Sequence, residues 1–368
     1  MANPTGSGRR ASLDWMRGLV MVFMAIDHAS MFYNAGRTSA DSALLYVPGS
    51  ELPLDQFLTR WITHLCAPTF LFLAGTAMAL SIARRVERGQ SDAEIDRFLV
   101  TRGLILIAIE FVMTPPGLTR LVVQVMYALG AAMICMALLR RLPAIWLAIA
   151  GVVWLGGGEA ISGLVWAPDE SGSVGVALLV GQHVSEHALI IYPLLPWLAM
   201  MMVGWAFGQL LMKRPDLMRV VLVVAGVGAL AVFAIVRGLD GYGNMGVYRD
   251  DGSLAQWLHV GKYPPSLSFA ALELGLMALL LVAFDVAERH VTVRHNGPLL
   301  VFGQTALFFY VVHHVLLMAP AIAGGLLGRL GLAESYLIAL GVLIALYPVC
   351  RWYRSYKRAH PNSWARFI

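Results

Sequence analysis

The sequence predicts an all-α protein, a polytopic bundle of about ten transmembrane helices with both termini in the cytoplasm. Composition is the first reason: hydrophobic residues make up 58% of the 368 residues and charged residues only 13%. An average soluble domain is about a quarter charged. The second reason is a series of apolar runs as long as the ~20 residues that cross a hydrocarbon core. The third is the alternation of charge between successive loops, described below.

Ten apolar segments are expected to span the bilayer, and the rest of the chain forms short loops and tails. Residues 1–10 form a polar tail expected to be disordered, residues 11–356 a single transmembrane domain, and residues 357–368 a cytoplasmic C-terminal tail. Residues 161–186 are Gly-rich and acidic, and their apolar piece is too short to span. The predicted spans are residues 12–33, 56–83, 98–114, 119–139, 143–160, 188–211, 217–237, 266–285, 298–320 and 331–350.

Charge in the loops orients these spans. Every second loop is basic, for example at Arg84-Arg85 and at Lys213-Arg214, and the loops between them are acidic or neutral. Basic loops stay on the cytoplasmic side, so the alternation places both termini there. The net charge of +5 is explained by these loops, and no nucleic-acid partner is predicted. The cysteines lie in or at the ends of apolar segments, which argues against a disulfide framework: Cys66, Cys135 and Cys350.

The first span, Ser12–Tyr33, combines an apolar composition with four ionisable residues. Asp14, Arg17 and His28 fall on one helical stripe, whereas Asp27 points elsewhere. Eleven residues of helix separate Arg17 from His28, which is about 16 Å. Charge inside a bilayer is costly. One face of this helix is therefore predicted to hold a cation near the cytoplasmic surface and an imidazole deep in the membrane.

Polar residues in other spans recur at the depth of His28. Ionisable residues within spans usually face a bundle interior or a watery cavity, so we expect a cavity in the outer half of the bundle. The residues at this level are His28, His64, His313, His314, Glu110, Gln124, Tyr127 and Glu273.

Three interpretations of this polar layer stay open on the residues alone. It is a hydrogen-bonded network that joins helices, a set of haem or metal ligands, or a site of general acid–base catalysis. The chain contains no CxxCH or HExxH motif, which disfavours the second. A non-enzymatic transporter or permease, with the polar residues as its substrate or proton path, is the main alternative to an enzyme.

Five stretches carry a resemblance to a known family: RRASLDWMRGLVMVFMAIDHASMFY, TRWITHLCAPTFLFLAGTAMAL, YPLLPWLAMMMVGWAFG, KYPPSLSF and LVFGQTALFFYVVHHVLL. Together, from Arg10 to Leu317, they resemble the bacterial branch of the heparan-α-glucosaminide N-acetyltransferase-like membrane proteins. The resemblance implies a multi-pass protein of the bacterial inner membrane that modifies carbohydrate. Its donor would be cytoplasmic acyl-CoA, with acetyl-CoA expected, and its acceptor a sugar or glycan on the other side.

The resemblance also implies roles for individual residues. The spacing of Arg17 and His28 is similar to that in the first helix of the acyltransferase-3 membrane enzymes, which implies that His28 is the catalytic base. His313 matches the family's Tyr-x-x-His pattern. With Asp27 and His64, it is expected to position His28 or to stabilise charge.

Binding residues complete the predicted site. Basic residues at cytoplasmic helix ends are expected to hold the anionic end of acyl-CoA, namely Arg17, Arg102 and Arg219. The polar loop 238–265 and the following helix are expected to line the acceptor mouth through Lys262, Tyr263 and Glu273. No metal is expected, the lipid bilayer is the surrounding partner, and the oligomeric state stays open, a homo-oligomer included.

Overall fold

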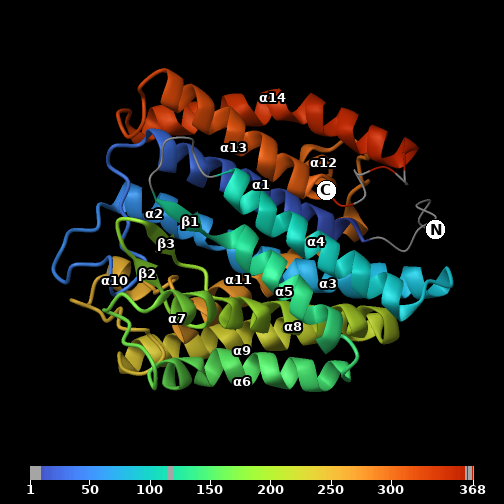
Figure 1. The fold of residues 1–368 in the computed structure, drawn as a ribbon, viewed down its shortest axis with the longest axis horizontal. Coiled ribbons are helices and arrows are strands. Elements are labelled where there is room, and N and C mark those ends of the chain that lie inside the picture. The colour runs from blue at the N-terminus through green and yellow to red at the C-terminus, as the bar shows by residue number, and fades with distance from the viewer. Residues whose placement is uncertain (1–9, 114–119, 361–362, 364–366, 368) are drawn as a thin grey trace. The chain divides into compact units, whose positions relative to one another are not determined.

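The computed structural model describes residues 10–113, 120–360, 363 and 367. Helices account for most of this part of the chain, as predicted (Figure 1). Two compact units can be distinguished: unit 1 comprises Met1–Ala35 and Met277–Ile368, and unit 2 comprises Gly36–Leu276. The predicted N-terminal tail, except for Arg10, lies outside the described residues, as do parts of the C-terminal tail and positions 114 and 119 at predicted span ends.

Unit 1 is built around the first helix. It contains α1 (Ala11–Tyr33), α12 (Pro298–Gln304), α13 (Ala306–Ala323), α14 (Leu332–Ala359) and residues 277–290 of α11 (Leu267–His290). Helix α1 packs against α12, α13 and α14. Burial of apolar side chains on these faces forms a core at the end of α1, consisting of Ala29, Phe32, Tyr33, Leu317, Met318, Ala321 and Ala339.

Unit 2 is organised around α8 (Leu194–Lys213), which contacts α3, α5 and α6. The other helices of this unit are α2 (Leu54–His64), α3 (Cys66–Glu87), α4 (Asp92–Val112), α5 (Val125–Leu139), α6 (Ala144–Ser162), α7 (Val174–Leu179), α9 (Met218–Leu239), α10 (Leu254–Leu258) and residues 267–276 of α11. A 3₁₀ turn, η1 (Pro215–Leu217), precedes α9. Helix α4 begins at a capping box between Ser91 and Glu94, a strong helix-start signal.

A small sheet in unit 2 was not predicted. Its strand order is β1 (Leu121–Val123), β3 (Ala188–Ile190) and β2 (His183–Val184), with β1 parallel and β2 antiparallel to β3. Two predicted spans are consequently shorter as helices: α5 starts at Val125 and α8 at Leu194, each after a strand. These strands are only two or three residues long, too short for a period-2 pattern to reveal.

Two predicted spans consist of two helices each. The break at Leu65 separates α2 from α3, and Pro68 explains it because proline has no N–H to donate to the His64 carbonyl. The break at Thr305 separates α12 from α13, and the Thr305 hydroxyl donates to the Val301 carbonyl oxygen at 2.9 Å. The first break places His64 at the last position of α2.

Glycines allow helix backbones to touch within each unit. A Cβ on Gly18 would lie 1.9 Å from the carbonyl oxygen of Leu299, so α1 and α12 are in backbone contact. In unit 2, a Cβ on Gly204 would lie 2.0 Å from the carbonyl oxygen of Phe72, which brings α8 against α3. Small residues at helix interfaces serve this purpose in membrane proteins.

The helices confirm a multi-pass membrane protein. Within the described residues, seven helical segments are long and apolar enough to cross a bilayer. Helices α1 and α4 are of similar length but are not among the seven, and the count of ten spans and the cytoplasmic termini stay predictions. The seven segments are Leu54–Glu87, Ala144–Ser162, Leu194–Lys213, Pro215–Leu239, Leu267–His290, Ala306–Ala323 and Leu332–Ala359.

Candidate functional site

In unit 1, two histidines that were predicted to act together form a direct pair. Nδ1 of His28, on α1, lies 2.9 Å from Nε2 of His313, on α13. Their rings are nearly parallel, with an interplanar angle of 7° and centroids 5.0 Å apart. His313 is fully buried and His28 is partly exposed. The packing of α1 against α13 therefore joins residues that are 285 positions apart in the sequence.

Hydrogen bonds assign the tautomers of this pair. Nδ1 of His313 lies 2.8 Å from the carbonyl oxygen of Phe309, which can only accept, so this nitrogen carries the proton. In a neutral imidazole, Nε2 of His313 is then the acceptor, and Nδ1–H of His28 donates to it. The lone pair of neutral His28 consequently lies on its Nε2. That atom is the one able to take a proton from a reacting group.

Other side chains surround the pair. The His314 ring meets His28 edge-on at a centroid distance of 5.2 Å, and Tyr310 does so at 6.0 Å. Both adjacent histidines of α13 thus reach His28, but only His313 accepts a hydrogen bond from it. Asp27 precedes His28 on α1 and is partly exposed.

Arg17 belongs to a charged cluster at the start of α1. It forms an ion pair with Asp14 (NH1–Oδ1, 2.9 Å), and Gln304 donates to the other oxygen of Asp14 at 3.1 Å. The amide oxygen of Gln304 accepts from Arg358 at 3.2 Å and from Arg354 at 3.4 Å. Arg17, which was predicted to bind the acyl donor, is therefore linked through Asp14 and Gln304 to two arginines of α14. In the sequence, these two arginines belong to the basic run after the last predicted span. That run was interpreted only as evidence for the orientation of the helices in the membrane.

In unit 2, the predicted His64 is held by a carboxylate that the sequence did not single out. Asp41 Oδ1 lies 3.1 Å from Nε2 of His64, and Asp41 Oδ2 accepts from Nε of Arg60 at 2.7 Å. All three side chains are buried. Burial alone would raise the pKa of the Asp41 carboxyl, but the charge of Arg60 and the His64 contact outweigh it and hold that pKa well below its usual range.

The same contacts fix the tautomer of His64. A carboxylate only accepts, so Nε2 of His64 carries a proton and Nδ1 holds the lone pair. Nδ1 is buried and has no hydrogen-bond partner among the described residues. An imidazole oriented by a buried carboxylate is the arrangement that positions general bases in hydrolytic triads. Arg60 was not among the predicted site residues. Its position one helical turn before His64, on the same face of the helix, was the sequence signal that could have indicated it.

The predicted acceptor residues Lys262 and Tyr263 lie against Asp41. Their backbone N–H groups donate to the Asp41 carbonyl oxygen at 2.7 and 3.1 Å. Arg60 donates to the Tyr263 hydroxyl at 3.0 Å, and Nζ of Lys262 lies 5.2 Å from the Tyr263 ring centroid. Glu273, on α11, is buried and interacts electrostatically with Lys262. The structure thus gathers the predicted acceptor residues around the Asp41–His64 pair.

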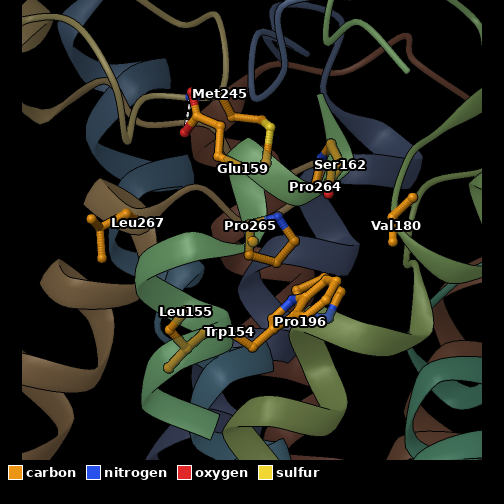
Figure 2. A pocket seen from close by; sticks show the side chains of 11 residues that line it. Trp154, Leu155, Glu159, Ser162, Val180, Pro196, Met245, Pro264, Pro265 and Leu267 are labelled. Carbon is orange, nitrogen blue, oxygen red and sulfur yellow. Dashed lines mark hydrogen bonds between the residues drawn. The ribbon is translucent and has the colours of Figure 1, made fainter. Parts of the chain in front are cut away.

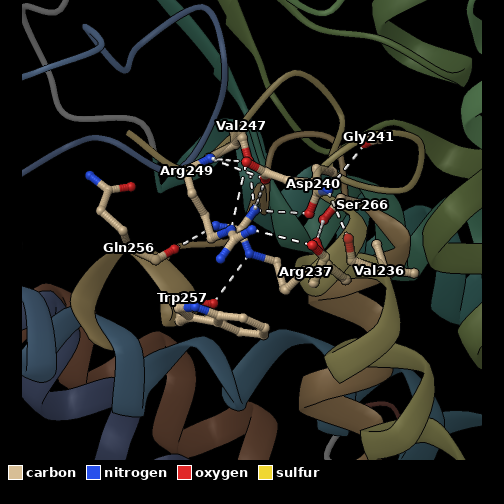
Figure 3. A network of polar contacts seen from close by, with 12 residues as sticks. Val236, Arg237, Asp240, Gly241, Val247, Arg249, Gln256, Trp257 and Ser266 are labelled. Atoms are coloured by element: carbon tan, nitrogen blue, oxygen red, sulfur yellow. Dashed lines mark hydrogen bonds and ion pairs between the residues drawn. The ribbon is translucent and has the colours of Figure 1, made fainter. Parts of the chain in front are cut away.

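A buried arginine organises the loop that carries these residues (Figure 3). Arg237, on α9, is fully buried and donates to the carbonyl oxygens of Val247 (2.8 Å) and Trp257 (3.2 Å), and to the Asn244 side chain (2.9 Å). Asp240 lies 3.8 Å away and balances part of its charge. Because the arginine donates to backbone carbonyls between Val247 and Trp257 and to the Asn244 side chain, it holds the part of the loop that precedes Lys262 in one conformation.

A small cavity lies beside this loop, between α6 and α8 (Figure 2). Its walls include Trp154, Pro196 and Pro265, and its size is about that of one water molecule. The Glu159 side chain, which also lines it, accepts from the Met245 N–H at 3.1 Å. The Glu159 carboxylate already accepts a hydrogen bond from the loop, so we interpret this cavity as a packing feature.

The other predicted cofactor residues lie on separate helices of unit 2. Arg102 is on α4 and Arg219 on α9, and both are partly buried. Their role in binding an anionic donor stays a prediction, as do the catalytic roles of His28, Asp27, His64 and His313.

The long apolar helices define a multi-pass helical membrane protein. Residues 9–236, more than half of the chain, match the family described as heparan-alpha-glucosaminide N-acetyltransferase, catalytic. The chain belongs to this family, as its sequence motifs indicated, and the family is one of membrane acetyltransferases. The matched region includes Arg17, His28, Asp41 and His64, whereas His313 lies beyond it. Comparison with curated proteins gives no match.

Proposed function

We propose that this protein transfers an acetyl group from cytoplasmic acetyl-CoA to a sugar-type acceptor on the opposite side of the bacterial inner membrane. Membership of the acetyltransferase family supports the reaction class. The observation that carries the assignment of the base is the hydrogen-bond chain from His28 through His313 to the Phe309 carbonyl. It leaves the lone pair of His28 on Nε2 and gives the imidazolium that forms there an acceptor for its other N–H.

The proposed reaction is a direct acyl transfer. The acceptor oxygen or nitrogen attacks the thioester carbonyl carbon while Nε2 of His28 takes its proton. The tetrahedral intermediate then collapses, the carbon–sulfur bond breaks, and the CoA thiolate receives the proton from His28. His313 keeps the imidazole in the reactive tautomer throughout, as the third residue of a triad does for its base. Asp27, the neighbour of His28 on α1, would stabilise charge.

The anionic end of the donor is proposed to bind at the start of α1. Arg17, Arg354 and Arg358 lie together there with one carboxylate, Asp14, and arginine is well suited to phosphate recognition. The ~16 Å along α1 from Arg17 to His28 suits the reach of an extended pantetheine arm.

Acetyl transfer by the purified protein in nanodiscs tests this function. Wild-type protein should transfer acetyl from acetyl-CoA to at least one member of a panel of amino sugars and glycans. His28→Ala should lower the rate by ~10²–10⁴-fold, the usual contribution of a general base, and His28→Asn should do no better. The matched control is His290→Ala, which removes an exposed histidine at the end of α11 and should change nothing.

Two results would overturn the proposal. One is full activity in His28→Ala, and the other is the absence of transfer from acetyl-CoA by wild-type protein to every acceptor of the panel. Size-exclusion profiles of each variant separate loss of chemistry from loss of folding.

A further inference from the structure

The basic run after the last predicted span is part of a helix. Helix α14 does not end at Cys350, where the predicted span ends, but continues to Ala359. From Ser335 to Ala359 the helix contains no acidic residue, and its last part is RWYRSYKRA. Where a span meets the lipid headgroups, α14 is therefore strongly basic.

Some side chains of this basic segment contact the rest of unit 1. The Tyr353 ring is stacked on Phe308 of α13, with centroids 4.0 Å apart and an interplanar angle of 6°. Arg354 is buried. Arg354 and Arg358 both donate to the amide oxygen of Gln304, at 3.4 and 3.2 Å. Two of the cations are thus engaged in the cluster at the start of α1.

Other side chains of the segment are exposed, and they combine aromatic rings with a different arginine. Trp352 is 62% exposed and Tyr356 39%, and their rings are stacked with centroids 5.8 Å apart. Arg351 is exposed, and its guanidinium carbon lies 5.9 Å from the Tyr347 ring centroid. The exposed part of the segment therefore offers two apolar rings and a cation to whatever surrounds it.

The exposed aromatic pair lies at the depth expected of a membrane boundary. Going back along α14 from Trp352, exposed apolar side chains recur at Ile344 and as far as Leu337. The helical rise puts Tyr356 about 28 Å from Leu337, close to the ~30 Å thickness of the hydrocarbon core. Tryptophan and tyrosine are enriched where spans enter the headgroup region. Arg351, beside the pair, is therefore placed at the level of lipid phosphates.

The chemistry of this surface selects the kind of partner. A guanidinium binds a phosphate through two parallel N–H donors, and basic residues next to a span attract anionic lipids. A phosphate in solution would contact Arg351 alone and leave the rings of Trp352 and Tyr356 in water. A phospholipid covers all three side chains, because its apolar part lies next to its phosphate. Charge and apolar exposure together favour the lipid.

We propose that Arg351, Trp352 and Tyr356 form a binding site for an anionic phospholipid of the leaflet at the C-terminal end of α14. Arg351 binds the phosphate of the headgroup, and the two rings pack against the lipid below it. The site is distinct from the proposed donor cluster, because Arg354 and Arg358 are engaged with Gln304. Lipid binding requires no acetyl transfer, so this site does not depend on the proposed function.

Photo-crosslinking of the full chain tests the site. Wild-type protein is placed in phosphatidylcholine nanodiscs with a small fraction of phosphatidylglycerol that carries a diazirine on its headgroup, and labelled peptides are identified by mass spectrometry. We expect labelling within residues 347–360 that unlabelled phosphatidylglycerol lowers. Arg351→Gln should lower it about 5-fold, the effect of one basic residue on an anionic lipid. Arg351→Lys keeps the charge and should retain most of the labelling, whereas Trp352→Ala should lose part of it.

Matched controls are Arg97→Gln, at an exposed arginine of α4, and Trp146→Ala, at a tryptophan that is also 62% exposed. Neither should change the labelling of α14. Arg351 and Trp352 are exposed, so their variants are expected to fold.

Three results would overturn the proposal. They are equal labelling of residues 347–360 by a phosphatidylcholine probe, wild-type labelling in Arg351→Gln and Trp352→Ala, and competition by inorganic phosphate or CoA but not by phosphatidylglycerol. Acetyl transfer, assayed in the same nanodiscs, decides the proposed function separately, since either result there leaves the lipid labelling as evidence for the site.

Discussion

The His28–His313 pair of unit 1 and the His64–Asp41 pair of unit 2 differ in the partner that orients the imidazole. In unit 1, His28 donates to another imidazole, His313, whose second nitrogen is bound to a backbone carbonyl. In unit 2, His64 donates to the carboxylate of Asp41, which is also bound to Arg60. The first pair contains no formal charge in its neutral form. The second contains a buried anion and its cation.

This difference separates two ways of placing a base in a protein interior. A carboxylate partner strongly favours the imidazolium, but a buried carboxylate needs a counter-ion to be tolerated at all. An imidazole partner fixes the tautomer without adding charge, which suits a helix face inside a membrane, where charge is costly. Two helices are sufficient to form the imidazole–imidazole pair, whereas the imidazole–carboxylate pair also requires the loop that carries Asp41. The two pairs should therefore respond differently to substitution.

Removing the counter-ion in unit 2 should have the largest effect. Arg60→Ala leaves Asp41 as an uncompensated buried carboxylate, which typically costs about 3–5 kcal/mol of stability. His313→Phe leaves no buried charge and should be much milder. Thermal unfolding in detergent compares the two variants with wild-type protein.

Arg97→Ala, at an exposed arginine of α4, is the matched control and should unfold like wild-type protein. Removing both charges, in Asp41→Asn with Arg60→Gln, should recover part of the loss. Equal stability of Arg60→Ala and wild-type protein would show that the ion pair is unimportant for folding.

The pH dependence of stability should distinguish the charged pair from the neutral one. The pKa of Asp41 is lower in the folded protein than in the unfolded chain, so its carboxylate stabilises the fold fully above the unfolded value of about 3.9. That contribution is lost as the pH falls through the lower, folded pKa. Unfolding temperatures of wild-type protein and Asp41→Asn should therefore differ by a constant amount between pH 8 and 5 and converge below about pH 4. A difference that widens on acidification would contradict the direction of the shift.

Loss of the neutral partner should act on catalysis rather than on folding. His313→Phe preserves the ring but removes the acceptor for His28 Nδ1–H, so the tautomer and orientation of the base are no longer fixed. We expect kcat to fall about 10- to 100-fold with KM little changed. His313→Gln, whose amide oxygen can accept from His28, should restore part of the rate. A rise in KM alone, with kcat intact, would assign His313 to binding instead.

The smallest expected effect concerns the donor end of unit 1. Arg17→Ala should weaken CoA binding about 10-fold, since charge-assisted contacts to phosphate are lost. Arg17→Lys should recover only part, because lysine lacks the planar fork. Isothermal titration in nanodiscs measures both, with Arg97→Ala as control. Unchanged affinity in Arg17→Ala would remove this arginine from the donor site.

Local sequence patterns were sufficient to predict the long helices and some residues of the candidate site. Apolar runs of spanning length predicted each long helix, because burial in a bilayer demands a continuous apolar surface whatever the neighbours are. The same patterns missed the three short strands and the helix ends next to them, which depend on pairing between distant segments. His28, His64 and His313 stood out because ionisable residues inside apolar runs are rare.

Only the tertiary structure decided which residues meet. His313 and His314 are adjacent and equivalent in the sequence, and the packing of α13 on α1 selects His313 as the hydrogen-bonded partner of His28. Asp41 is one acid in a loop of several, and nothing in its spacing connects it to His64. Its selection follows from burial beside Arg60, because a carboxylate can lie in a protein interior only where a cation and hydrogen-bond donors compensate for lost water. The sequence by itself therefore determined the membrane class and the rare polar residues, and three-dimensional packing determined their pairing, tautomers and counter-ions.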